Sequence, residues 1–465
     1  MEKINRILID CSKTYFNGLN TGIERVVRNI VLRSEIISHK LNTKVSPVIL
    51  ESINGYKTIE PLLNKKKENN DFKNNLKSFL TDRLYLNKKG IIYNFFKTTW
   101  SFIKRFQFFF TGLWQISNSF IYKIFALGYG TVLPEKNDLL IVIDSFMDYR
   151  YNIYFNFFCK KLRKNGGMVV VLLYDIIPLT NPDFFEKSLV SGFKEKIKKF
   201  NGLVDAILTI SRSEAEIIRK ENIFNIKSRQ IAFFYPGYDF QNEAFSCEKR
   251  ESNDNPEENN VRKELSDIIS LIKRAYDAEL TNRIYLMVGT IEARKGYDYV
   301  VDVFEELWKK RFGGILFVAG KIGWNVNSLM EKFKNSGQFN KKLFVFNNLN
   351  DREIDFLYKE ASAVICASLR EGFGLPLVEA MRYEIPVFAS DIAVFREIGG
   401  DFPIYFEPCK TGLAEALKTE KSRFSKKIGN GENKASARNI SWNESINMFS
   451  DEINKLIGNN IGLRN

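Results

Sequence analysis

The sequence predicts an α/β protein of two domains, in which parallel β-sheets carry helices on both faces. Its 465 residues suit two domains, and a hydrophobic fraction of 45% is enough for two large cores. Short and almost continuous apolar runs alternate along the chain with stretches of helical periodicity. Such runs are typical of strands buried on both faces, and their alternation with helices indicates βαβ units of Rossmann type.

The first half shows this alternation from its start. A strand is expected at 4–10 (INRILID), followed by a helix from about Gly22 that runs through GIERVVRNIVLRSEII. The N-terminal pattern lacks the long apolar core and the cleavage site of a signal peptide. Further strands, with helices between them, are expected at 138–146 (DLLIVIDSF), 167–178 (GMVVVLLYDIIP), 205–211 (DAILTIS) and 231–236 (IAFFYP).

The second half repeats the alternation more clearly. Strands are expected at 283–289 (RIYLMVG), 314–320 (GILFVAG), 342–348 (KLFVFNN), 363–368 (AVICAS), 385–390 (IPVFAS) and 403–408 (PIYFEP). Helices are expected at 297–310, 326–337, 351–362 and 393–400. Another helix is expected to follow the loop after AVICAS and to end at about Arg382. This order predicts a second parallel sheet that is buried on both faces.

The domain boundaries follow from composition and pattern. The polar, acidic stretch Cys247–Asn260 predicts an exposed loop where the two domains join. We therefore expect an N-terminal domain over 1–240, a junction over 241–280 and a C-terminal domain over 281–435. The amphipathic pattern SWNESINMFSDEINKLIG places a closing helix within 436–465.

A long segment, 53 to about 137, interrupts the first domain. Within it, Ile91–Gly128 contains four basic residues, no acidic residue and many aromatic ones. Its longest uncharged run, Phe106–Tyr122, is shorter than the roughly 20 apolar residues of a membrane-spanning helix. Two interpretations stay open: the segment lies in the membrane interface, or it is a helical insertion that packs its aromatic side chains onto the domain.

The net charge of +14 comes from the first half. Residues 1–240 carry 37 Lys and Arg against 22 Asp and Glu, while 241–465 carry 32 against 33. A basic half favours an anionic partner, such as phosphates or a membrane face. Nucleic acid is not expected, because no helix-turn-helix, RRM or zinc pattern is present. The five cysteines form no C-x-x-C pair, which argues against a zinc site and fits a reducing cytoplasm.

Two loops of the second half carry candidate binding cations. Ligands of an open parallel sheet bind at the carboxyl ends of its strands, so loops that follow strands are the places to search. In VGTIEARKG, Arg294 and Lys295 lie just before a predicted helix, where two cations suit a diphosphate. In AGKIGW, Lys321 adds charge at the same edge. Taken alone, the first loop is a weak signal, because solvated basic turns are common, and the second is better interpreted as an ordinary turn.

A third loop, SLREGFGLPLVEA, brackets two glycines with two carboxylates. Gly372 and Gly374 would let backbone N–H groups point at a phosphate or sugar oxygen. Glu371 precedes the glycines, and Glu379 lies about one turn along the next helix. Because carboxylates accept hydrogen bonds from paired hydroxyls, we expect one carboxylate for each end of a nucleotide sugar. The alternative is a capped helix with two solvated glutamates.

Together these motifs resemble the retaining glycosyltransferases of the GT-B fold, specifically the large family 4. The resemblance is strong from Arg283 to Pro408, through GTIEARKG, GKIGW, REGFGLPLVEA and SDIAVFREIGGD. In the first half it is looser, through TGIERVVRN, YDIIPLTNPDFF, ILTISRSE and YPGYD. It implies two Rossmann-like domains that face a central cleft, with the 53–137 segment as a helical insertion in the N-terminal domain.

The resemblance also implies a site for a nucleotide-diphosphate sugar. Arg294 and Lys295 would hold the diphosphate and stabilise the leaving group, and Glu371 would contact the donor sugar. Further donor-binding residues implied in this way are Gly22, Thr290, Gly372, Phe373, Gly374, Leu375, Glu379, Asn348 and Leu349. Tyr174 and Asp175 would form the loop that meets the donor sugar or the acceptor. No metal or other cofactor is implied, and the leaving phosphate is thought to help deprotonate the acceptor.

One departure from the family concerns the D-x-x-P loop, where many relatives have histidine before the aspartate. This chain has Tyr174, which can donate a hydrogen bond but does not titrate near neutral pH. Its only histidine, His39, is expected at the surface. The departure bears on donor-sugar identity and turnover. It also motivates a second hypothesis, a catalytically silent GT-B scaffold or binding subunit of a polysaccharide assembly complex.

The first hypothesis is a retaining hexosyltransferase of cell-surface polysaccharide biosynthesis, for example of lipopolysaccharide O-antigen or capsule. It would use a nucleotide sugar and a lipid-linked or growing polysaccharide acceptor. The basic first half and the aromatic segment would hold it on the anionic inner face of the plasma membrane, from the cytoplasm. The pair GTIEARKG and GKIGW resembles mannosyltransferases, which predicts a mannose-like donor sugar.

Overall fold

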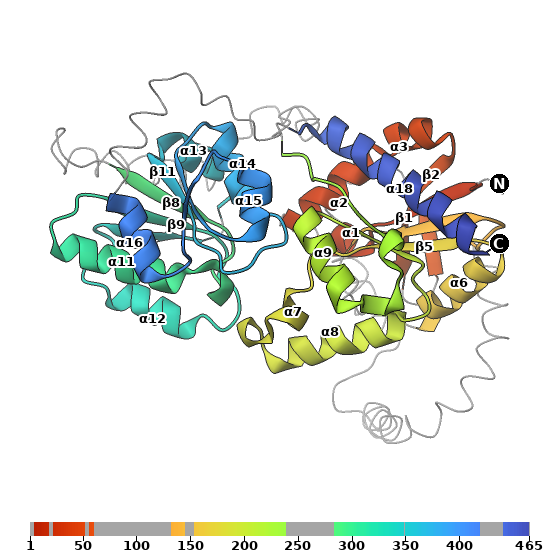
Figure 1. Ribbon diagram of the computed structural model, residues 1–465, viewed down its shortest axis with the longest axis horizontal. Helices are drawn as coiled ribbons and strands as arrows, with labels where there is room; N and C mark the ends of the chain where they lie inside the picture. Colours follow the sequence, from red (N-terminus) through yellow and green to blue (C-terminus); the bar gives the residue numbers. More distant parts are fainter. Residues whose placement is uncertain are drawn as a thin grey trace, which may run out of the picture. The chain divides into compact units, whose positions relative to one another are not determined.

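The computed structural model describes residues 4–17, 22–51, 55–59, 132–144, 153–238, 283–347, 349–418 and 440–464 (Figure 1). They separate into two compact units. The first contains the described residues up to Leu172 with Gly202–Ala206 and Arg464, and the second contains those of Leu173–Asn201 and Ile207–Leu463. The domain boundaries expected from composition stay a prediction.

The first sheet has the strand order β3-β2-β1-β4-β5-β6-β7. Its strands are β1 (Arg6–Asp10), β2 (Lys44–Glu51), β3 (Gly55–Thr58), β4 (Asp138–Val142), β5 (Met168–Leu172), β6 (Ala206–Thr209) and β7 (Ile231–Phe233). Strand β1 pairs in parallel with β2 and β4, whereas β3 runs antiparallel to β2. The sequence analysis did not predict β2 or β3. Pro47 of β2 lies opposite Ile9 of β1. Proline weakens the strand pattern in the sequence, because it cannot donate a hydrogen bond to a neighbouring strand.

Seven helices accompany this sheet within the described residues: α1 (Ser12–Asn17), α2 (Gly22–Leu32), α3 (Ser34–Leu41), α6 (Ile153–Lys164), α7 (Ile177–Thr180), α8 (Lys187–Phe200) and α9 (Arg212–Glu221). The single helix expected from Gly22 is in fact two. Arg33, at φ −107° and ψ 21°, separates them, and its Nη1 donates to Asn29 Oδ1 at 2.7 Å. His39 is exposed on α3, as predicted.

The second sheet has the strand order β10-β9-β8-β11-β12-β13, and all its pairings are parallel. The strands are β8 (Ile284–Val288), β9 (Ile315–Ala319), β10 (Leu343–Phe346), β11 (Ala363–Cys366), β12 (Val387–Ser390) and β13 (Ile404–Phe406). Each lies within a strand predicted from the sequence. From β8 the chain adds β9 and β10 on one side, and it then returns to add β11, β12 and β13 on the other side of β8. The boundary between β8 and β11 is therefore a topological switch point, where open α/β sheets bind ligands.

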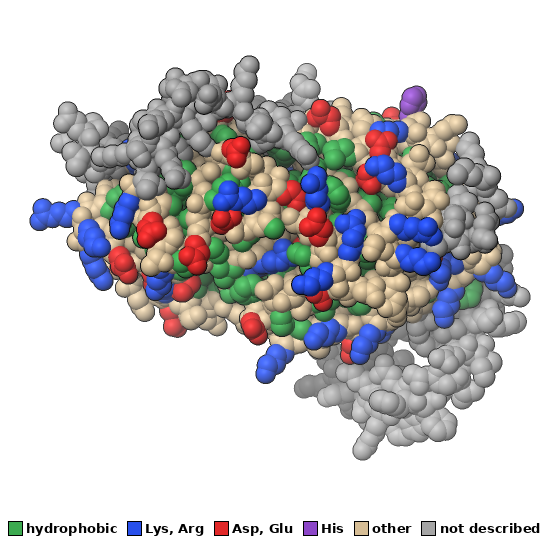
Figure 2. Space-filling model, viewed as in Figure 1, with side chains coloured by type: hydrophobic (Ala, Val, Ile, Leu, Met, Phe, Trp, Pro, Cys, Tyr) green, Lys and Arg blue, Asp and Glu red, His purple; other side chains and the backbone are tan. Residues whose placement is uncertain are grey.

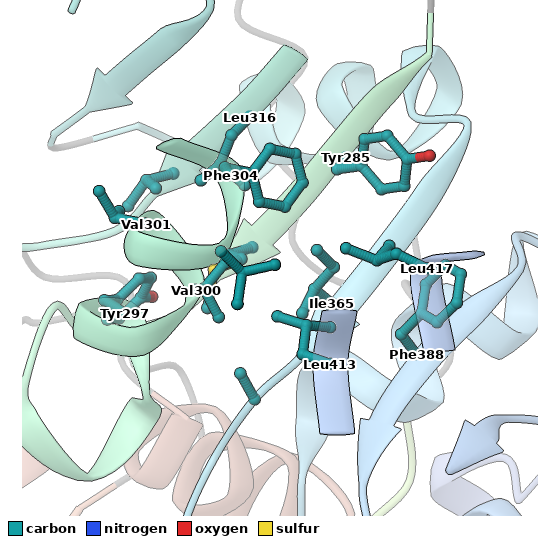
Figure 3. Packing of buried hydrophobic residues seen from close by; sticks show 14 of the residues in the cluster. Tyr285, Tyr297, Val300, Val301, Phe304, Leu316, Ile365, Phe388, Leu413 and Leu417 are labelled. Carbon is teal, nitrogen blue, oxygen red and sulfur yellow. The ribbon is translucent and has the colours of Figure 1, made fainter. Parts of the chain in front are cut away.

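Helices cover both faces of the second sheet (Figure 1). Side chains of α11 (Tyr297–Lys309), α12 (Asn327–Asn335) and α16 (Lys410–Lys418) form one core with Tyr285 and Met287 of β8. Those of α13 (Asp351–Glu360), α14 (Leu375–Arg382) and α15 (Ala393–Gly399) form the other with Ile284 and Leu286. Successive β8 residues therefore point to opposite cores, as the pleat requires. In Figure 3, Tyr285 lies beside Phe304 of α11, with ring centroids 5.3 Å apart.

The last helix, α18 (Trp442–Arg464), packs against the segment that follows β7. The rings of Phe234 and Phe449 meet edge to face with centroids 5.3 Å apart. Ser445 Oγ donates to Tyr235 O at 2.7 Å. The expected closing helix is therefore present, and it covers residues of the first half of the chain.

Several predicted features lie outside the described residues: the aromatic segment Ile91–Gly128, the acidic stretch Cys247–Asn260 and Asn348. The two interpretations of the aromatic segment therefore stay open. Within the described ranges, none of the helices combines the length and the apolar character that crossing a bilayer requires.

Candidate functional site

The candidate site lies at the carboxyl ends of β8 and β11, on either side of the switch point. Strand β8 leads through Gly289 (φ 137°) to a short 3₁₀ helix, Ala293–Lys295. Strand β11 leads into the loop that contains Glu371. The two loops are joined through their backbones, since Leu369 N donates to Arg294 O at 2.7 Å. The fold therefore brings the predicted cations and the predicted carboxylate together.

Glu371 is the centre of a buried ion-pair cluster, with only 6% of its surface exposed. Its Oε2 accepts from Arg294 Nη1 at 2.8 Å, and its Oε1 forms an ion pair with Lys295 Nζ. Ser368 Oγ also donates to Oε1, at 2.7 Å. Burial alone would raise the pKa of Glu371, but the charges of Lys295 and Arg294 outweigh burial and lower it to about 2. The carboxylate is therefore ionised at neutral pH.

Arg294 is held in place by three acceptors. Besides Glu371, its guanidinium donates to Arg370 O at 3.0 Å and pairs with Glu292 Oε1 at 2.7 Å. Burial lowers the pKa of Arg294, and the carboxylates of Glu371 and Glu292 raise it by more, so the guanidinium keeps its charge. A guanidinium fixed by three acceptors has a defined orientation, which suits recognition of a phosphate.

A small pocket opens beside this cluster and is lined in part by Lys295, Ser368 and Glu371. Cys366 also lines it. Burial raises the pKa of the Cys366 thiol to about 12, so the thiol stays protonated at neutral pH. Because the thiolate is the nucleophilic form of cysteine, the pocket offers cations and a carboxylate rather than a cysteine nucleophile.

The glycine-containing loop between the two predicted carboxylates has the backbone geometry that glycine permits. Gly374 has φ 105°, and a Cβ there would lie 2.6 Å from the Phe395 ring. Leu375 begins α14 directly afterwards, and Phe373 is buried. Glu379 is buried on α14, where its Oε2 accepts from Tyr358 Oη at 2.7 Å. The alternative of two solvated glutamates is therefore wrong, because both carboxylates are buried and partnered.

The loop that follows β5 lies against the Glu371 loop. A Cβ on Gly372 would be 2.8 Å from Tyr174 O, so glycine is needed for this approach. Asp175 Oδ1 accepts from Ile177 N at 3.1 Å. Burial raises the pKa of Asp175, while Arg294 lowers it and Glu371 raises it further. The structure thus brings Tyr174 and Asp175 to the ion-pair cluster.

Not every predicted residue joins this cluster. Thr290 is half-buried directly after Gly289, and Leu349 packs against the core beneath α13 and α14. Gly22 begins α2 in the first unit. Lys321 is exposed, although its carbonyl accepts from Ile291 N at 2.8 Å. The donor-binding roles of these residues stay predictions.

Sequence reasoning gave no role to three residues that the structure places in the cluster, namely Ser368, Arg370 and Glu214. Ser368 and Arg370 are neighbours of Glu371, and that proximity was the available signal. Glu214 lies in S-R-S-E, a pattern that indicates a helix capping box. Ser211 Oγ does accept from Glu214 N at 3.1 Å, but the Glu214 carboxylate binds elsewhere.

Gly320, at the end of β9, permits the close approach of the β8 loop. A Cβ on Gly320 would lie 1.8 Å from Gly289 O. We expect Gly320→Ala to lower the free energy of unfolding by about 1–3 kcal/mol, since the backbone must shift to relieve the clash. Urea titration of the purified variant measures this change.

Gly337→Ala is the matched control for that substitution, because a Cβ on Gly337 meets nothing within 4 Å. We expect its unfolding midpoint to stay at the wild-type value. Equal midpoints for Gly320→Ala and wild type would contradict the close approach of Gly289 to Gly320.

Among the residues that the structure describes, no group of three or more His, Cys, Asp and Glu is arranged to hold a metal ion. The expectation that no metal is needed stays a prediction. The charges of the site come from its own side chains, chiefly Arg294, Lys295 and Glu371.

Curated proteins similar to this chain include mannosyltransferases. This chain is 31% identical over 302 residues to "Serotype-specific mannosyltransferase WbdA" of Escherichia coli. The aligned region covers 63% of this chain and 34% of WbdA. The chain is 24% identical over 277 residues to "O-antigen chain mannosyltransferase B" of Escherichia coli, which covers 59% of this chain and 66% of that protein. The chain thus spans about a third of the length of WbdA.

Solved structures show the same fold at low sequence identity. A glycosyltransferase from Rickettsia africae matches with a TM-score of 0.52 at 15% identity, over 99% of this chain and 100% of its own. A sucrose-phosphate synthase from Thermosynechococcus elongatus matches with a TM-score of 0.55 at 12% identity, over 98% of this chain and 99% of the synthase chain. The chain therefore has the GT-B fold, with two parallel-sheet, Rossmann-like α/β domains.

A protein-family model, "Glycosyl transferases group 1", matches residues 269–426. This range contains the second sheet and the ion-pair cluster of Glu371, Arg294 and Lys295. The predicted resemblance to glycosyltransferases is thereby confirmed for this range: residues 269–426 form a glycosyl transferases group 1 domain.

Proposed function

We propose that the protein is a retaining glycosyltransferase that moves a hexose from a nucleotide-diphosphate sugar to a glycan acceptor. The observation that carries this proposal is the buried cluster of Glu371, Arg294 and Lys295 at the switch point of the second sheet. It places two fixed cations and one ionised carboxylate at the edge where open α/β sheets bind nucleotides.

Each member of the cluster has a role in this proposal. Arg294 and Lys295 bind the diphosphate and stabilise the negative charge that develops on it as the bond to the sugar breaks. Glu371 accepts hydrogen bonds from hydroxyls of the donor sugar, and Glu379 serves the ribose end. Tyr174 and Asp175 meet the sugar from the other side. The acceptor hydroxyl attacks the anomeric carbon, and its proton passes to the leaving phosphate.

The donor sugar proposed is mannose or a closely related hexose. The names of the E. coli relatives support this choice, because both are mannosyltransferases and one is assigned to O-antigen chains. We therefore place the reaction in the assembly of a cell-surface polysaccharide, on a lipid-linked or growing glycan acceptor.

Exposed lysines support a location on the anionic inner face of the plasma membrane. On α8, Lys187, Lys194, Lys198 and Lys199 are exposed. Figure 2 shows Lys and Arg side chains spread over the drawn face, with Asp and Glu among them mainly toward its left and centre. A surface rich in exposed lysine is attracted to anionic lipids, which would bring the protein to a lipid-linked acceptor.

The proposal is tested by offering the purified protein a panel of nucleotide sugars in a thermal-shift assay, followed by a transfer assay with a lipid-linked acceptor. A donor that binds the folded state raises Tm by mass action. We expect GDP-mannose to raise Tm and its sugar to appear on the acceptor with the α configuration retained, as judged by NMR.

The outcomes separate the two hypotheses for this chain. A Tm shift without transfer to any acceptor would favour the catalytically silent scaffold, which Tyr174 in place of histidine motivates. No shift with any nucleotide sugar, in a folded sample, would contradict a donor site altogether.

A further inference from the structure

Glu214 joins two loops of the candidate site that are far apart in the sequence. Its Oε1 accepts from Ile176 N at 2.9 Å, in the loop that carries Tyr174 and Asp175. Its Oε2 pairs with Arg370 Nη2 at 2.8 Å, in the loop that carries Glu371. One carboxylate thus spans both loops with one oxygen for each.

The burial of this carboxylate makes its contacts costly to break. Glu214 has no exposed surface, and the Arg370 side chain is 16% exposed. Removal of one partner of a buried ion pair leaves the other charge without compensation, which is strongly unfavourable. Neither Glu214 nor Arg370 can therefore leave the contact without a large cost.

Two further contacts fix the same pair of loops. Ser211, the N-cap of α9, donates through Oγ to Gly372 O at 2.8 Å and also accepts from Glu214 N. Gly372 lies so close to Tyr174 O that a Cβ would be 2.8 Å from that oxygen. The start of α9 therefore holds both loops at a defined separation.

We propose that Glu214 is a positioning residue for sugar transfer, which sets the Tyr174–Asp175 loop against the loop of Glu371. The inference rests on the proposed function, because both loops would contact the donor sugar. It gives the ILTISRSE motif a part in the reaction besides capping a helix. Glu214 acts through Arg370 and Ile176 and does not itself touch the substrate.

The protonation of Glu214 provides a readout that a merely structural role would not affect. Burial raises the pKa of Glu214 to about 7, while Arg370 lowers it and Asp175 raises it. Arg370, from the Glu371 loop, and Asp175, from the loop after β5, are the charged groups that act on it. Above pH 7 the ionised carboxylate holds Arg370 by a charge-assisted bond, and below pH 7 protonation weakens that bond.

The test is Glu214→Gln, assayed for sugar transfer in the full chain. The glutamine amide has one acceptor oxygen and one NH₂ group, which only donates. It can therefore keep the hydrogen bond from Ile176 or that from Arg370, but not both. We expect kcat to fall by about 10- to 100-fold, because small displacements of reacting groups cost about two orders of magnitude. The Kd for GDP should change by less than about 2-fold, since Arg294 and Lys295 are untouched. The fall of wild-type activity below pH 7 should disappear in the variant.

Glu397→Gln is the matched control. Glu397 accepts from Arg212 N and Ser213 N at 2.7 Å each, so it also anchors the start of α9, but these hydrogen bonds go to the helix and not to either site loop. We expect Glu397→Gln to keep the wild-type kcat and pH profile. An equal loss of kcat in both variants would overturn the proposal, because it would assign the effect to displacement of the helix.

A double variant covers the case in which Glu214→Gln does not fold. Glu214→Gln with Arg370→Gln removes both buried charges, and replacing both partners costs far less than removing one. We expect it to fold and to keep the low kcat. Wild-type kcat in either folded variant would overturn the positioning role and leave the proposed function intact, whereas absence of transfer by the wild-type protein would overturn the proposed function itself.

Discussion

Glu371→Gln is expected to abolish most sugar transfer, with kcat lower by about 10³-fold, the scale found when a single preorganised electrostatic group is removed. The substitution keeps the shape of the side chain but removes the negative charge that Arg294 and Lys295 neutralise. It also replaces an acceptor oxygen with an amide donor that faces these cations. The measurement is the transfer rate with saturating GDP-mannose and acceptor.

Glu415→Gln is the control for this substitution, because Glu415 is exposed on α16, outside the candidate site. We expect it to leave kcat unchanged. Thermal unfolding of both variants is measured alongside, since two buried cations without their carboxylate also destabilise the fold. A folded Glu371→Gln protein with the wild-type transfer rate would remove Glu371 from the mechanism.

Lys295→Ala is expected to weaken binding of the donor, because the variant loses one of the two cations proposed to bind the diphosphate. A hydrogen bond to a charged group contributes about 1.5–3 kcal/mol, which corresponds to an increase of about 10- to 100-fold in the Kd for GDP. Calorimetric titration of GDP into wild-type and variant protein measures this change. The result differs in kind from that of Glu371→Gln, where we expect kcat rather than nucleotide affinity to carry the loss.

Lys309→Ala provides the comparison for charge alone. Lys309 is exposed in the last turn of α11, the helix that follows Lys295 in the chain. If both variants lost the same affinity for GDP, general attraction between the basic protein and an anion would explain binding, and Lys295 would have no specific contact with the diphosphate.

The second half of the fold could be predicted because its strands are buried on both faces. A run such as IYLMV in β8 has no polar position, so its limits are plain in the sequence. Strand β2 was missed because Pro47 and the charged residues at its two ends, Lys44 and Glu51, interrupt the apolar pattern of a strand. The break at Arg33 was missed because GIERVVRNIVLRSEII keeps its apolar periodicity across the interruption.

The candidate site could be predicted in part for a related reason. Arg294, Lys295 and Glu371 follow neighbouring strands, and the carboxyl ends of parallel strands meet at one edge of the sheet. Glu214 was beyond this logic, because its partner Arg370 is 156 residues away and belongs to a different motif. No periodicity encodes such a pairing. The pattern S-R-S-E, moreover, is already accounted for locally as a helix capping box.

The packing of α18 has a consequence for how the protein is made. Phe234 and Tyr235 leave the ribosome long before the helix that covers them, since Ser445 bonds to Tyr235 across 210 residues of sequence. At about 5–20 residues per second, the gap lasts about 10–40 s. Long-range contacts of this kind form late in folding. We therefore expect the nascent chain to complete its group 1 domain first, and to cover Phe234 and Tyr235 only after α18 has been synthesised.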